Sequence, residues 1–581
     1  MADKKISQLT EVTSLPDGAK LYAIDLSRAE GDRDVQIAKS NLVAGNDSHI
    51  NLEDYGAVAD NLGDSGVDST TAFTDAIDDL IALGGGRLYI PFTNNKRFNI
   101  TVSQDVPLDY SNITIFGGGR IFIKALDPLG ATGRGQLITM AANVENFTIE
   151  GIDVLVSSTC FRSNFKRGII GSELGGHKDI SILDCSLKNQ TKLDTEIGVD
   201  GITFYKDVTD LSDTETIERL TISGCDIDLY GRAIYGIQLL RKTLYCSINS
   251  NKVTLQAWQA TSGQTYNAIA MYGDGEFFSI KNNVVLGSGH SGIACSMCAN
   301  GIVEGNFVSN VINAVEAGIE VEYKLSHGSA TFMTENINVV NNHVSNCEYG
   351  IWVTERDSSA TTLAPRNINI QGNIVENSIE NGIFVASGIS GSPNYTSRIS
   401  NVYIKDNIVR GDLGGAGIAL YDGNDCEISG NSVVGATASG IRLGRNSTIF
   451  PTGMLKVSNN HTQGTTTRGI YQESGQVDVI YDSNVVEDFG VLAIEYTNPN
   501  IATKITCINN LVKDGNIGIR FLGMSLNSGT VLVGNQGRDL SGKILQCDVF
   551  NGLCDNNIGV STGGFDLAAI GSTVLGYNPS F

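Results

Sequence analysis

A repeat of about 28 residues constrains the fold of this 581-residue chain more than any other feature. From residue 250 onward, an Asn followed closely by an apolar residue returns at Asn251, Asn283, Asn306, Asn342, Asn373, Asn407, Asn431, Asn460, Asn484, Asn510 and Asn535. In most units a Gly-Ile pair follows eight to twelve residues later, at Gly292, Gly318, Gly350, Gly382, Gly417, Gly440, Gly469 and Gly518. Weaker copies upstream have Gly168, Gly201 and Gly236 before Ile, and Cys185 and Cys225 in place of the Asn.

Each repeat contains about three short segments with two-residue alternation, for example 368–371, 374–376 and 383–386, separated by Asn, Gly and Ser. A unit of this size cannot bury its apolar face alone, so successive units must stack. Because no helical pattern lies between the strands, we expect an all-β fold. The expected architecture is a single-stranded parallel β-helix, in which each strand pairs with its counterpart ~4.8 Å away in the next coil.

The recurring Asn fits a turn inside each coil. Its side-chain amide can donate and accept hydrogen bonds with the Asn above and below, and can satisfy backbone groups at a buried bend. Cys185 and Cys225 fit the same position as small apolar substitutes where the ladder has not begun. The chain has 11 Cys in total, and those outside the ladder are scattered along it. We therefore expect free and mostly buried thiols.

One helix is predicted ahead of the repeats. Apolar residues recur at helical spacing in 70–83, and three glycines at 84–86 end the pattern. A helix at this position would cover the first coil and block edge pairing.

Composition excludes some functions. The chain has 63 acidic and 40 basic residues, a net charge of -23, so nucleic acid and anionic membrane surfaces would repel it. No run approaches the ~18 apolar residues of a membrane span, and Met1 to Lys5 lead into no apolar signal segment. We therefore expect no nucleic-acid partner and no membrane insertion, and synthesis and retention in a cytosol.

Three segments carry a family resemblance: 54–60 (DYGAVAD), 68–73 (DSTTAF) and 84–91 (GGGRLYIP). Together they resemble the opening of the pectate-lyase-like right-handed β-helix superfamily. That superfamily includes lyases, hydrolases, epimerases and binding shafts, so the likeness implies the fold and no single reaction.

Residues 1–46 resemble the short N-terminal β module with which bacteriophage tailspikes dock on the virion. An ordinary strand pair folded onto the shaft is the alternative. The tailspike resemblance implies a homotrimer attached to a phage tail or baseplate protein through 1–46, located on the virion after assembly in the host cytoplasm. The expected division is a docking module at 1–46, the β-helix entry and capping helix at 47–110, the shaft at 111–537 and a trimer-sealing segment at 538–581.

Chemistry is expected on the outside of the shaft, because stacked side chains fill the inside. In the Gly-Ile strands Ile points inward, so the next residue and every second one beyond point outward. Five aromatic residues in this outward column are expected to stack on sugar rings: Tyr272, Trp352, Phe384, Tyr421 and Tyr471. Packing against a neighbouring subunit is the alternative.

Paired carboxylates indicate a reaction. Glu320 and Glu322 leave one face of the same strand, and one coil later Trp352 should lie beside Glu320 and Glu355 near Glu322. Crowded like charges would raise one carboxyl pKa, as a general acid for glycosidic cleavage requires. We therefore predict Glu320, Glu322 and Glu355 as catalytic and Arg356 as substrate-binding. A merely solvated acidic face is the alternative.

The predicted function is binding and hydrolysis of a bacterial surface polysaccharide, either O-antigen or capsule. A lyase on the same fold would instead need a base and an Arg that neutralises a uronate; His290, His327, Lys324, Arg356 and Arg442 are available. A non-catalytic adhesin or structural spike is the third reading. No metal-binding or nucleotide-binding motif occurs, so no cofactor and no required metal are predicted, with calcium at surface carboxylates left open. If the glutamates fail, Asp200, Asp226 and Asp228 are the next acidic candidates.

Overall fold

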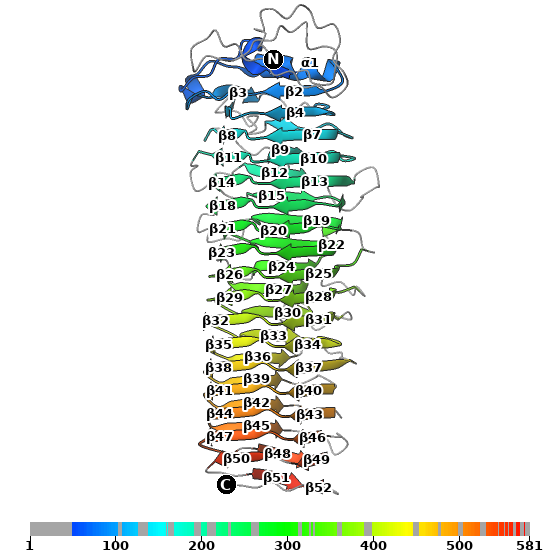
Figure 1. The fold of residues 1–581 in the computed structure, drawn as a ribbon, viewed down its shortest axis with the longest axis vertical. Coiled ribbons are helices and arrows are strands. Elements are labelled where there is room, and N and C mark those ends of the chain that lie inside the picture. The colour runs from blue at the N-terminus through cyan, green and yellow to red at the C-terminus, as the bar shows by residue number, and fades with distance from the viewer. Residues whose placement is uncertain are drawn as a thin grey trace, which may run out of the picture.

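The shaft is a stack of parallel β coils, as the repeat predicts (Figure 1). A computed structural model describes residues 49–575, with breaks at 103–106, 126–136, 159, 161–167, 191–198, 206–215, 231–233, 257–265, 312–316, 325–326, 329–331, 357–362, 388–397, 445–452, 474–477, 498–503, 523–529, 544, 551, 556, 562–564 and 570–573. Within these ranges no helix is both long and apolar enough to cross a bilayer.

Each full coil contributes one strand to each of three columns, named here in chain order. The first column contains β1 (His49–Asn51), β2 (Gly86–Tyr89), β4 (Ile113–Phe116), β7 (Glu145–Glu150), β10 (Lys178–Leu183), β13 (Ile217–Ser223), β16 (Thr243–Leu244), β17 (Ser247–Asn249), β20 (Ser279–Lys281), β25 (Glu335–Val340), β28 (Arg366–Gln371), β31 (Ser400–Lys405), β34 (Cys426–Ser429), β37 (Met454–Ser458), β40 (Asp478–Asp482), β43 (Lys504–Ile508), β46 (Thr530–Val533), β49 (Gly552–Asp555) and β52 (Val574–Leu575).

The second column forms a separate sheet. It contains β3 (Phe98–Val102), β5 (Arg120–Ala125), β8 (Asp153–Val156), β11 (Ser186–Asn189), β14 (Asp226–Tyr230), β18 (Lys252–Gln256), β21 (Val284–Ser288), β23 (Phe307–Val311), β26 (His343–Ser345), β29 (Ile374–Glu376), β32 (Ile408–Leu413), β35 (Ser432–Ala436), β38 (His461–Thr465), β41 (Val485–Phe489), β44 (Leu511–Gly515), β47 (Gln536–Leu540) and β50 (Ile558–Ser561).

The third column contains the Gly-Ile strands. Its members are β6 (Ile138–Thr139), β9 (Gly168–Ser172), β12 (Asp200–Tyr205), β15 (Ile237–Leu240), β19 (Ile269–Glu276), β22 (Ile293–Glu304), β24 (Ala317–Tyr323), β27 (Tyr349–Glu355), β30 (Ile383–Ser387), β33 (Ile418–Tyr421), β36 (Ser439–Gly444), β39 (Arg468–Glu473), β42 (Leu492–Thr497), β45 (Ile517–Leu522), β48 (Leu545–Phe550) and β51 (Phe565–Ala569). The long strands β19 and β22 continue into the first column, where β22 also pairs with β25.

Stacked aliphatic side chains fill the interior. In the third column Ile319, Ile351, Ile383 and Ile418 lie in register one above the other and are fully buried. Burial of each such side chain contributes roughly 1.5–3 kcal/mol, and the stack has no room for a ligand.

The Asn ladder forms as predicted and extends one coil further, to Asn557. Each Asn Nδ2 donates to the Oδ1 of the next Asn at 2.8–3.0 Å, and the same Oδ1 also accepts the backbone N–H of the preceding Asn. The Nδ2 donates as well to a carbonyl at the end of a first-column strand, as from Asn373 to Val339. The ladder thus satisfies the buried bend between the first and second columns.

Cysteine begins the ladder. The Cys225 N–H donates to the Asn251 Oδ1 at 3.0 Å, while the thiols of Cys185 and Cys225 are buried. The ten described cysteines are all free and buried, which confirms the sequence expectation for them.

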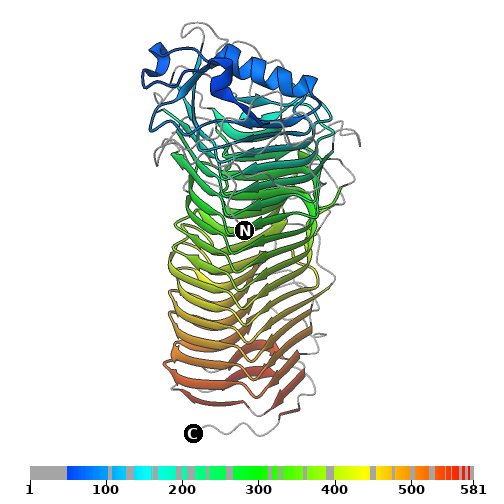
Figure 2. The same ribbon diagram turned by 45° about the horizontal axis from the view of Figure 1, so that its top comes forward.

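The N-terminal end of the shaft is covered by a helix. The helix α1 (Thr70–Ala82) lies across the first coil (Figure 2) and contacts the short 3-10 helix η3 (Leu52–Tyr55), which a second one, η4 (Gly63–Ser65), follows in the chain. It buries Phe73, Ile77 and Leu80. The helix ends with a hydrogen bond of 2.9 Å from the Gly85 N–H to the Leu80 carbonyl. The backbone of the neighbouring Gly84 is in the left-handed region, as is common at a helix C-terminus. The predicted helix is therefore confirmed, one residue shorter at its end.

The structure describes only one of the two terminal segments in the predicted domain division. The docking module at 1–46 lies outside the described residues. Beyond 537, strands β48, β49, β50, β51 and β52 still pair in parallel with the preceding coil. The coil ladder therefore continues past the expected boundary, and a sealing role for 538–581 stays a prediction.

We expect Asn373→Leu and Asn407→Leu each to lower the free energy of unfolding by ~1–3 kcal/mol, because backbone groups at the bend lose their partners in a buried site. Urea denaturation measures this. Asn369→Leu on the solvent side of β28 is the matched control and should change stability by less than ~0.5 kcal/mol. Equal stability of all three variants would contradict the structural role of the ladder.

Candidate functional site

The register of the third column brings the predicted carboxylates to one place. Glu320 on β24 pairs with Trp352 on β27, as the Gly-Ile alignment predicts, and Glu322 pairs with Thr354. Their neighbours Ile319, Val321, Ile351 and Val353 belong to the interior core, whereas Trp352 belongs to a separate apolar cluster outside it. Glu320 and Glu322 therefore lie on the outer side of the sheet.

Glu355 does not join them. The alignment predicts Glu355 near Glu322, but Glu355 pairs with Tyr323 and is fully buried. Because side chains alternate along a strand, Glu355 lies on the opposite side of the sheet from Glu322. The strand β27 continues through residue 355, so its alternation does not end where the prediction placed a strand end.

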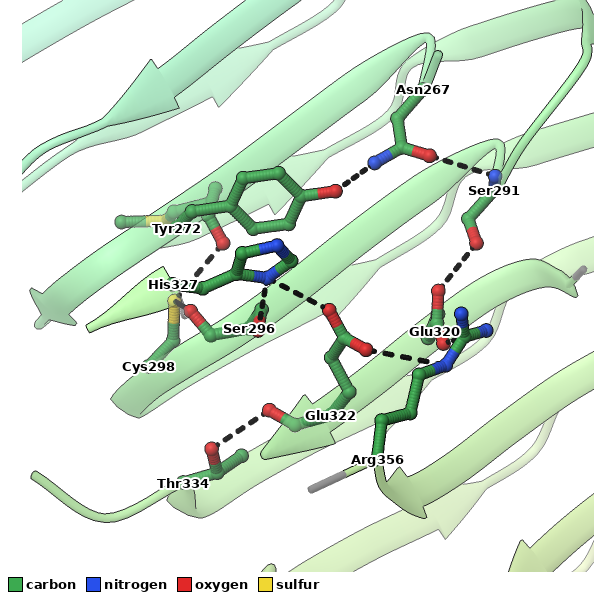
Figure 3. Close-up of polar contacts among 11 residues, drawn as sticks. Asn267, Tyr272, Ser291, Ser296, Cys298, Glu320, Glu322, His327, Thr334 and Arg356 are labelled. Atoms are coloured by element: carbon green, nitrogen blue, oxygen red, sulfur yellow. Dashed lines mark hydrogen bonds and ion pairs between the residues drawn. The ribbon is translucent and has the colours of Figure 1, made fainter. Parts of the chain in front are cut away.

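A guanidinium group bridges the two outer glutamates. Arg356 Nη2 lies 2.6 Å from Glu320 Oε1, and its Nε lies 3.3 Å from Glu322 Oε2 (Figure 3). The same guanidinium lies 4.6 Å from the centre of the Trp352 ring, a cation–π contact. Arg356 is therefore engaged by two carboxylates and an aromatic face of its own chain.

His327 holds the second carboxylate from the other side. Its Nδ1 lies 3.0 Å from Glu322 Oε1 and 2.9 Å from Ser296 Oγ. An ionised carboxylate can only accept, so Nδ1 carries the hydrogen. Burial lowers the pKa of His327 below its ordinary value despite the opposing influence of Glu322. A neutral His327 that donates from Nδ1 to an ionised Glu322 satisfies this geometry.

The expected rise of a carboxyl pKa is wrong for Glu322. Burial alone would raise the pKa of Glu322, but the hydrogen bond from His327 and the charge of Arg356 outweigh it and lower the pKa to about 2. The prediction counted the neighbouring acids and missed the two nitrogen donors. Glu322 is thus an ionised carboxylate and not a general acid.

A chain of side chains continues to Tyr272. The Ser291 hydroxyl donates to Glu320 Oε2 at 2.5 Å, and the Ser291 N–H donates to Asn267 Oδ1 at 2.8 Å. Asn267 Nδ2 in turn donates to the Tyr272 hydroxyl. The Tyr272 ring stacks on His327 with 4.2 Å between ring centroids and is only 5% exposed. Tyr272 therefore positions His327 and does not present the open sugar platform that the sequence predicts.

Three of the other predicted platforms belong to one aromatic cluster on the same face. Trp352 and Phe384 stack with ring centroids 5.9 Å apart, Tyr421 meets Phe384 edge-on at 5.5 Å, and Tyr349 stacks on Phe384 at 5.4 Å. Trp352 is 2% and Phe384 9% exposed, so in this structure both rings are covered. The half-buried Tyr349 and Tyr421 form the more accessible part of the cluster.

His327 and Arg356 are more exposed to solvent than the two glutamates that they contact. The side chain of His327 is 18% exposed and that of Arg356 10%, against 3% for Glu322 and 1% for Glu320. A ligand approaching this face would meet His327 and Arg356 first, with the glutamates behind them.

Sequence reasoning underrated His327, which it named only as a base available to a lyase. His327 follows β24 outside any strand, so the two-residue alternation could not place it. Asn267 and Ser291 were missed although a signal existed, because each stands two residues before the Ile that opens its third-column strand.

Among the remaining acidic candidates, Asp200 is not brought together with Asp226 and Asp228. Asp226 and Asp228 lie on β14 of the second column, where Asp226 pairs with Lys188 at 3.0 Å. Asp200 begins β12 of the third column and accepts the Tyr235 N–H at 2.8 Å. They lie on different faces of the shaft.

No group of three His, Cys, Asp or Glu side chains is placed to hold a metal ion among the residues that the structure describes. The prediction that no metal or cofactor is required remains untested.

Comparison with known proteins supports the fold. Residues 209–397 match the family model described as right handed beta helix region. The SPbeta prophage-derived uncharacterized protein YomE of Bacillus subtilis (strain 168) is 31% identical over 156 residues, which are 26% of this chain and 22% of that protein. The match thus spans about a fifth of this relative.

Two solved structures are similar at low identity. The A-module of mannuronan C-5 epimerase AlgE4 of Azotobacter vinelandii has a TM-score of 0.35 at 17% identity, covering 76% of this chain and 95% of that one. The tailspike protein of E. coli bacteriophage HK620 in complex with pentasaccharide has a TM-score of 0.39 at 12% identity, covering 94% and 82%. Scores of this size carry no information on reaction or substrate. The fold is a right-handed parallel β-helix, as expected from the sequence.

The low pKa of Glu322 predicts acid sensitivity. Its folded pKa of about 2 lies below the ordinary 4.5, so its ionised form contributes stability above pH ~4.5 that is lost as the pH falls towards 2. The shift corresponds to ~3 kcal/mol. Urea denaturation should show Glu322→Gln less stable than wild type at pH 7, with the difference shrinking near pH 2. Glu335→Gln, which removes an exposed partner of Arg366, is the control with a change under ~1 kcal/mol. A pH-independent difference for Glu322→Gln would contradict the ionised state.

Proposed function

We propose that this chain binds a bacterial surface polysaccharide, O-antigen or capsule, along the outer face of the third column and cleaves it by hydrolysis. The supporting observation is the group of Glu320, Glu322 and Arg356 beside the aromatic cluster on one continuous face. Sugar rings offer apolar C–H faces to aromatic rings and hydroxyls to polar groups, so such a face suits an extended glycan.

The charge of the site favours hydrolysis over elimination. Among the described residues in contact here, two carboxylates and one guanidinium leave a net negative charge, with the charge of Lys324 acting on Glu322 from nearby. Glycosidic hydrolysis passes through an oxocarbenium-like transition state, whose positive charge this site would stabilise. Elimination from a uronate would need a cation to neutralise the substrate carboxylate. Arg356, the cation nearest the site, is already engaged by Glu320 and Glu322.

Each residue of the site would have a distinct role in hydrolysis. Glu322 is the ionised carboxylate that stabilises the positive charge of the transition state, and it orients His327 through Nδ1. With Nδ1 protonated, the other ring nitrogen of His327 can accept a proton from a water whose oxygen attacks the anomeric carbon. The glycosidic C–O bond breaks, and the leaving oxygen takes up a proton from solvent. Glu320 positions Arg356, and Arg356 contacts the sugar hydroxyls.

A second pair of carboxylates lies at the edge of the aromatic cluster. Glu348 precedes Tyr349, and the Glu380 N–H of the next coil donates to the Glu348 carbonyl at 2.8 Å. Burial, with the charge of Glu380, raises the pKa of Glu348. Glu348 lies six residues before Thr354, the register partner of Glu322, or ~20 Å along an extended strand. The two pairs are therefore rival locations for the reaction and not parts of one site.

Glu322→Gln should lower the rate of polysaccharide cleavage by ~10²–10⁴-fold, because it removes the charge and keeps the shape. Release of new reducing ends from purified host polysaccharide measures the rate. Glu335→Gln is the control and should cleave at the parental rate. Cleavage by Glu322→Gln at the parental rate would contradict the assignment, and Glu348→Gln would then test the second pair.

The same assay separates the alternatives. Binding without shortened oligosaccharides would favour the adhesin reading, and products with an unsaturated uronate would favour a lyase. A lyase is the second candidate because His327 has the geometry of a base, and such products would contradict the charge argument above.

The proposal includes a tailspike arrangement, in which residues 1–46 dock the protein to a phage tail or baseplate protein and three copies associate. Deleting 1–46 should then leave a folded oligomer with unchanged melting and unchanged polysaccharide binding, because the shaft buries its own core. Calorimetry and a glycan-binding assay on the truncated protein test this. Aggregation of the truncated protein would instead show that 1–46 folds onto the shaft.

A further inference from the structure

The outer face of the second column changes character along the shaft. Near the N-terminus its outward positions carry paired charges, as Arg120 with Asp153 at 3.2 Å and Lys188 with Asp226 at 3.0 Å. From β21 onward, one outward position in register becomes largely apolar. Its members in chain order are Val284, Phe307, His343, Ile374, Ile408, Ser432, His461, Val485, Leu511, Gln536 and Ile558.

This apolar stripe, defined as the eleven residues just named, is partly open to solvent. Ile408 is 40% and Ile558 42% exposed, and the neighbouring outward Val434 is 37% exposed. The residues that alternate with the stripe, such as Val375, Val409 and Val486, are fully buried in the interior. Seven of the eleven members are apolar, and four polar residues stand between them, His343, Ser432, His461 and Gln536. Scattered exposed aliphatic residues are ordinary, but apolar residues that recur at one outward position in coil after coil mark an interaction surface.

The sequence of these strands points the same way. In parallel sheets that are buried on both faces, strands consist of continuous apolar runs rather than alternating ones. Such runs occur at Val284 and Val285, Ile374 and Val375, Ile408 and Val409, Val485 and Val486, and Leu511 and Val512. One face of each run packs inside the shaft, so the other is built to be covered as well.

We propose that this apolar stripe packs against another copy of the chain and forms the contact between shafts. The strands that carry the stripe, from β21 to β50, are stacked in a straight column along the shaft (Figure 1), so the stripe matches a second straight shaft better than a compact globular partner. Ten steps of ~4.8 Å by strands ~16 Å wide give ~770 Å² for the outer face of this part of the second column, with the stripe and the charged positions beside it taken together. A standard protein interface buries about this area, ~800 Å² per partner.

The charged residues beside the stripe are paired within the chain, so they do not prevent two copies from packing together. Two copies of net charge -23 repel each other, so their interface must avoid unpaired acids. The acidic residues that flank the stripe are neutralised within the chain, Glu376 by Arg410 at 2.7 Å and Glu487 by Lys513 at 2.9 Å. The surface that another copy would meet is therefore apolar with compensated charges at its rim.

The inference rests on the association of copies included in the proposed function, and it adds the surface that makes the contact. That surface lies on the second column, whereas the polysaccharide face lies on the third. Assembly through the stripe would therefore leave the candidate site on its own face.

Light scattering after size exclusion tests the stripe on the full chain. Wild type should have a mass that is a multiple of 61.8 kDa, and Ile374→Asp with Ile408→Asp should reduce it to 61.8 kDa. Asn369→Asp with Tyr403→Asp is the matched control, because these residues also pair in adjacent coils but lie on the first column. The control should keep the wild-type mass. A monomeric wild type, or an unchanged mass in the stripe variant, would overturn the proposal.

A second measurement covers the case in which the Asp variant fails to fold. Under mild oxidation, Ile408→Cys should give a covalent dimer on a denaturing gel, whereas Tyr403→Cys should not. Absence of the dimer, or equal dimer from both variants, would overturn the proposal. Loss of polysaccharide binding with an unchanged mass would show that the stripe binds glycan, and would also overturn it. Mass and cross-linking do not depend on cleavage, so failure of the hydrolase assignment leaves this test intact.

Discussion

The hydrogen-bonded Asn ladder fixes the geometry on which the rest of the shaft depends. A bend between two strands exposes backbone donors and acceptors, and in the interior of a stack these have no water to bond. Each Asn supplies an acceptor for the backbone N–H of the preceding Asn and donors for a carbonyl and for the next Asn, as Asn373 does with Val339 and Asn407. Because the same bend recurs in coil after coil, the three columns stay in register from one end of the ladder to the other.

Register in turn creates the candidate site. Glu320 and Trp352 are 32 positions apart in the chain and become neighbours only because their coils align residue by residue. Burying two carboxylates there costs several kcal/mol per ion unless partners compensate. Arg356 and His327 are those partners, and they also explain why Glu322 stays ionised. The arrangement is therefore a charge-compensated network, whose chemistry differs from that of two crowded acids.

Sequence periodicity predicted what depends on the repeat and failed where the repeat has no influence. It located the Asn ladder, the capping helix, the inward Ile stack and the pairing of Glu320 with Trp352, because each follows from a fixed spacing. It misplaced Glu355, because strand alternation continues to the end of β27. It underrated His327, which follows a strand at no fixed spacing, and it missed the burial of Trp352, which depends on Tyr349 and Arg356 packing over the ring. Contacts made by residues three or four positions apart, or by residues that follow a strand, leave no trace in a two-residue pattern.

The columns of this shaft differ in how their outer positions are used, and that difference is visible in the strands themselves. Third-column strands alternate Ile or Val with charged, aromatic or small residues, which is the pattern of a sheet that packs on one side and presents chemistry on the other. Many second-column strands beyond β18 are apolar at both the inward and the outward position. A chain with a net charge of -23 would gain solubility from acids at those outward positions, and the first coils do carry charges there. Val, Phe, Ile or Leu takes their place in seven of the eleven later coils. Apolar residues at these outward positions have no use inside the shaft, because the interior is already filled by the alternate residues. The apolar stripe is accounted for only by something outside the shaft that covers it.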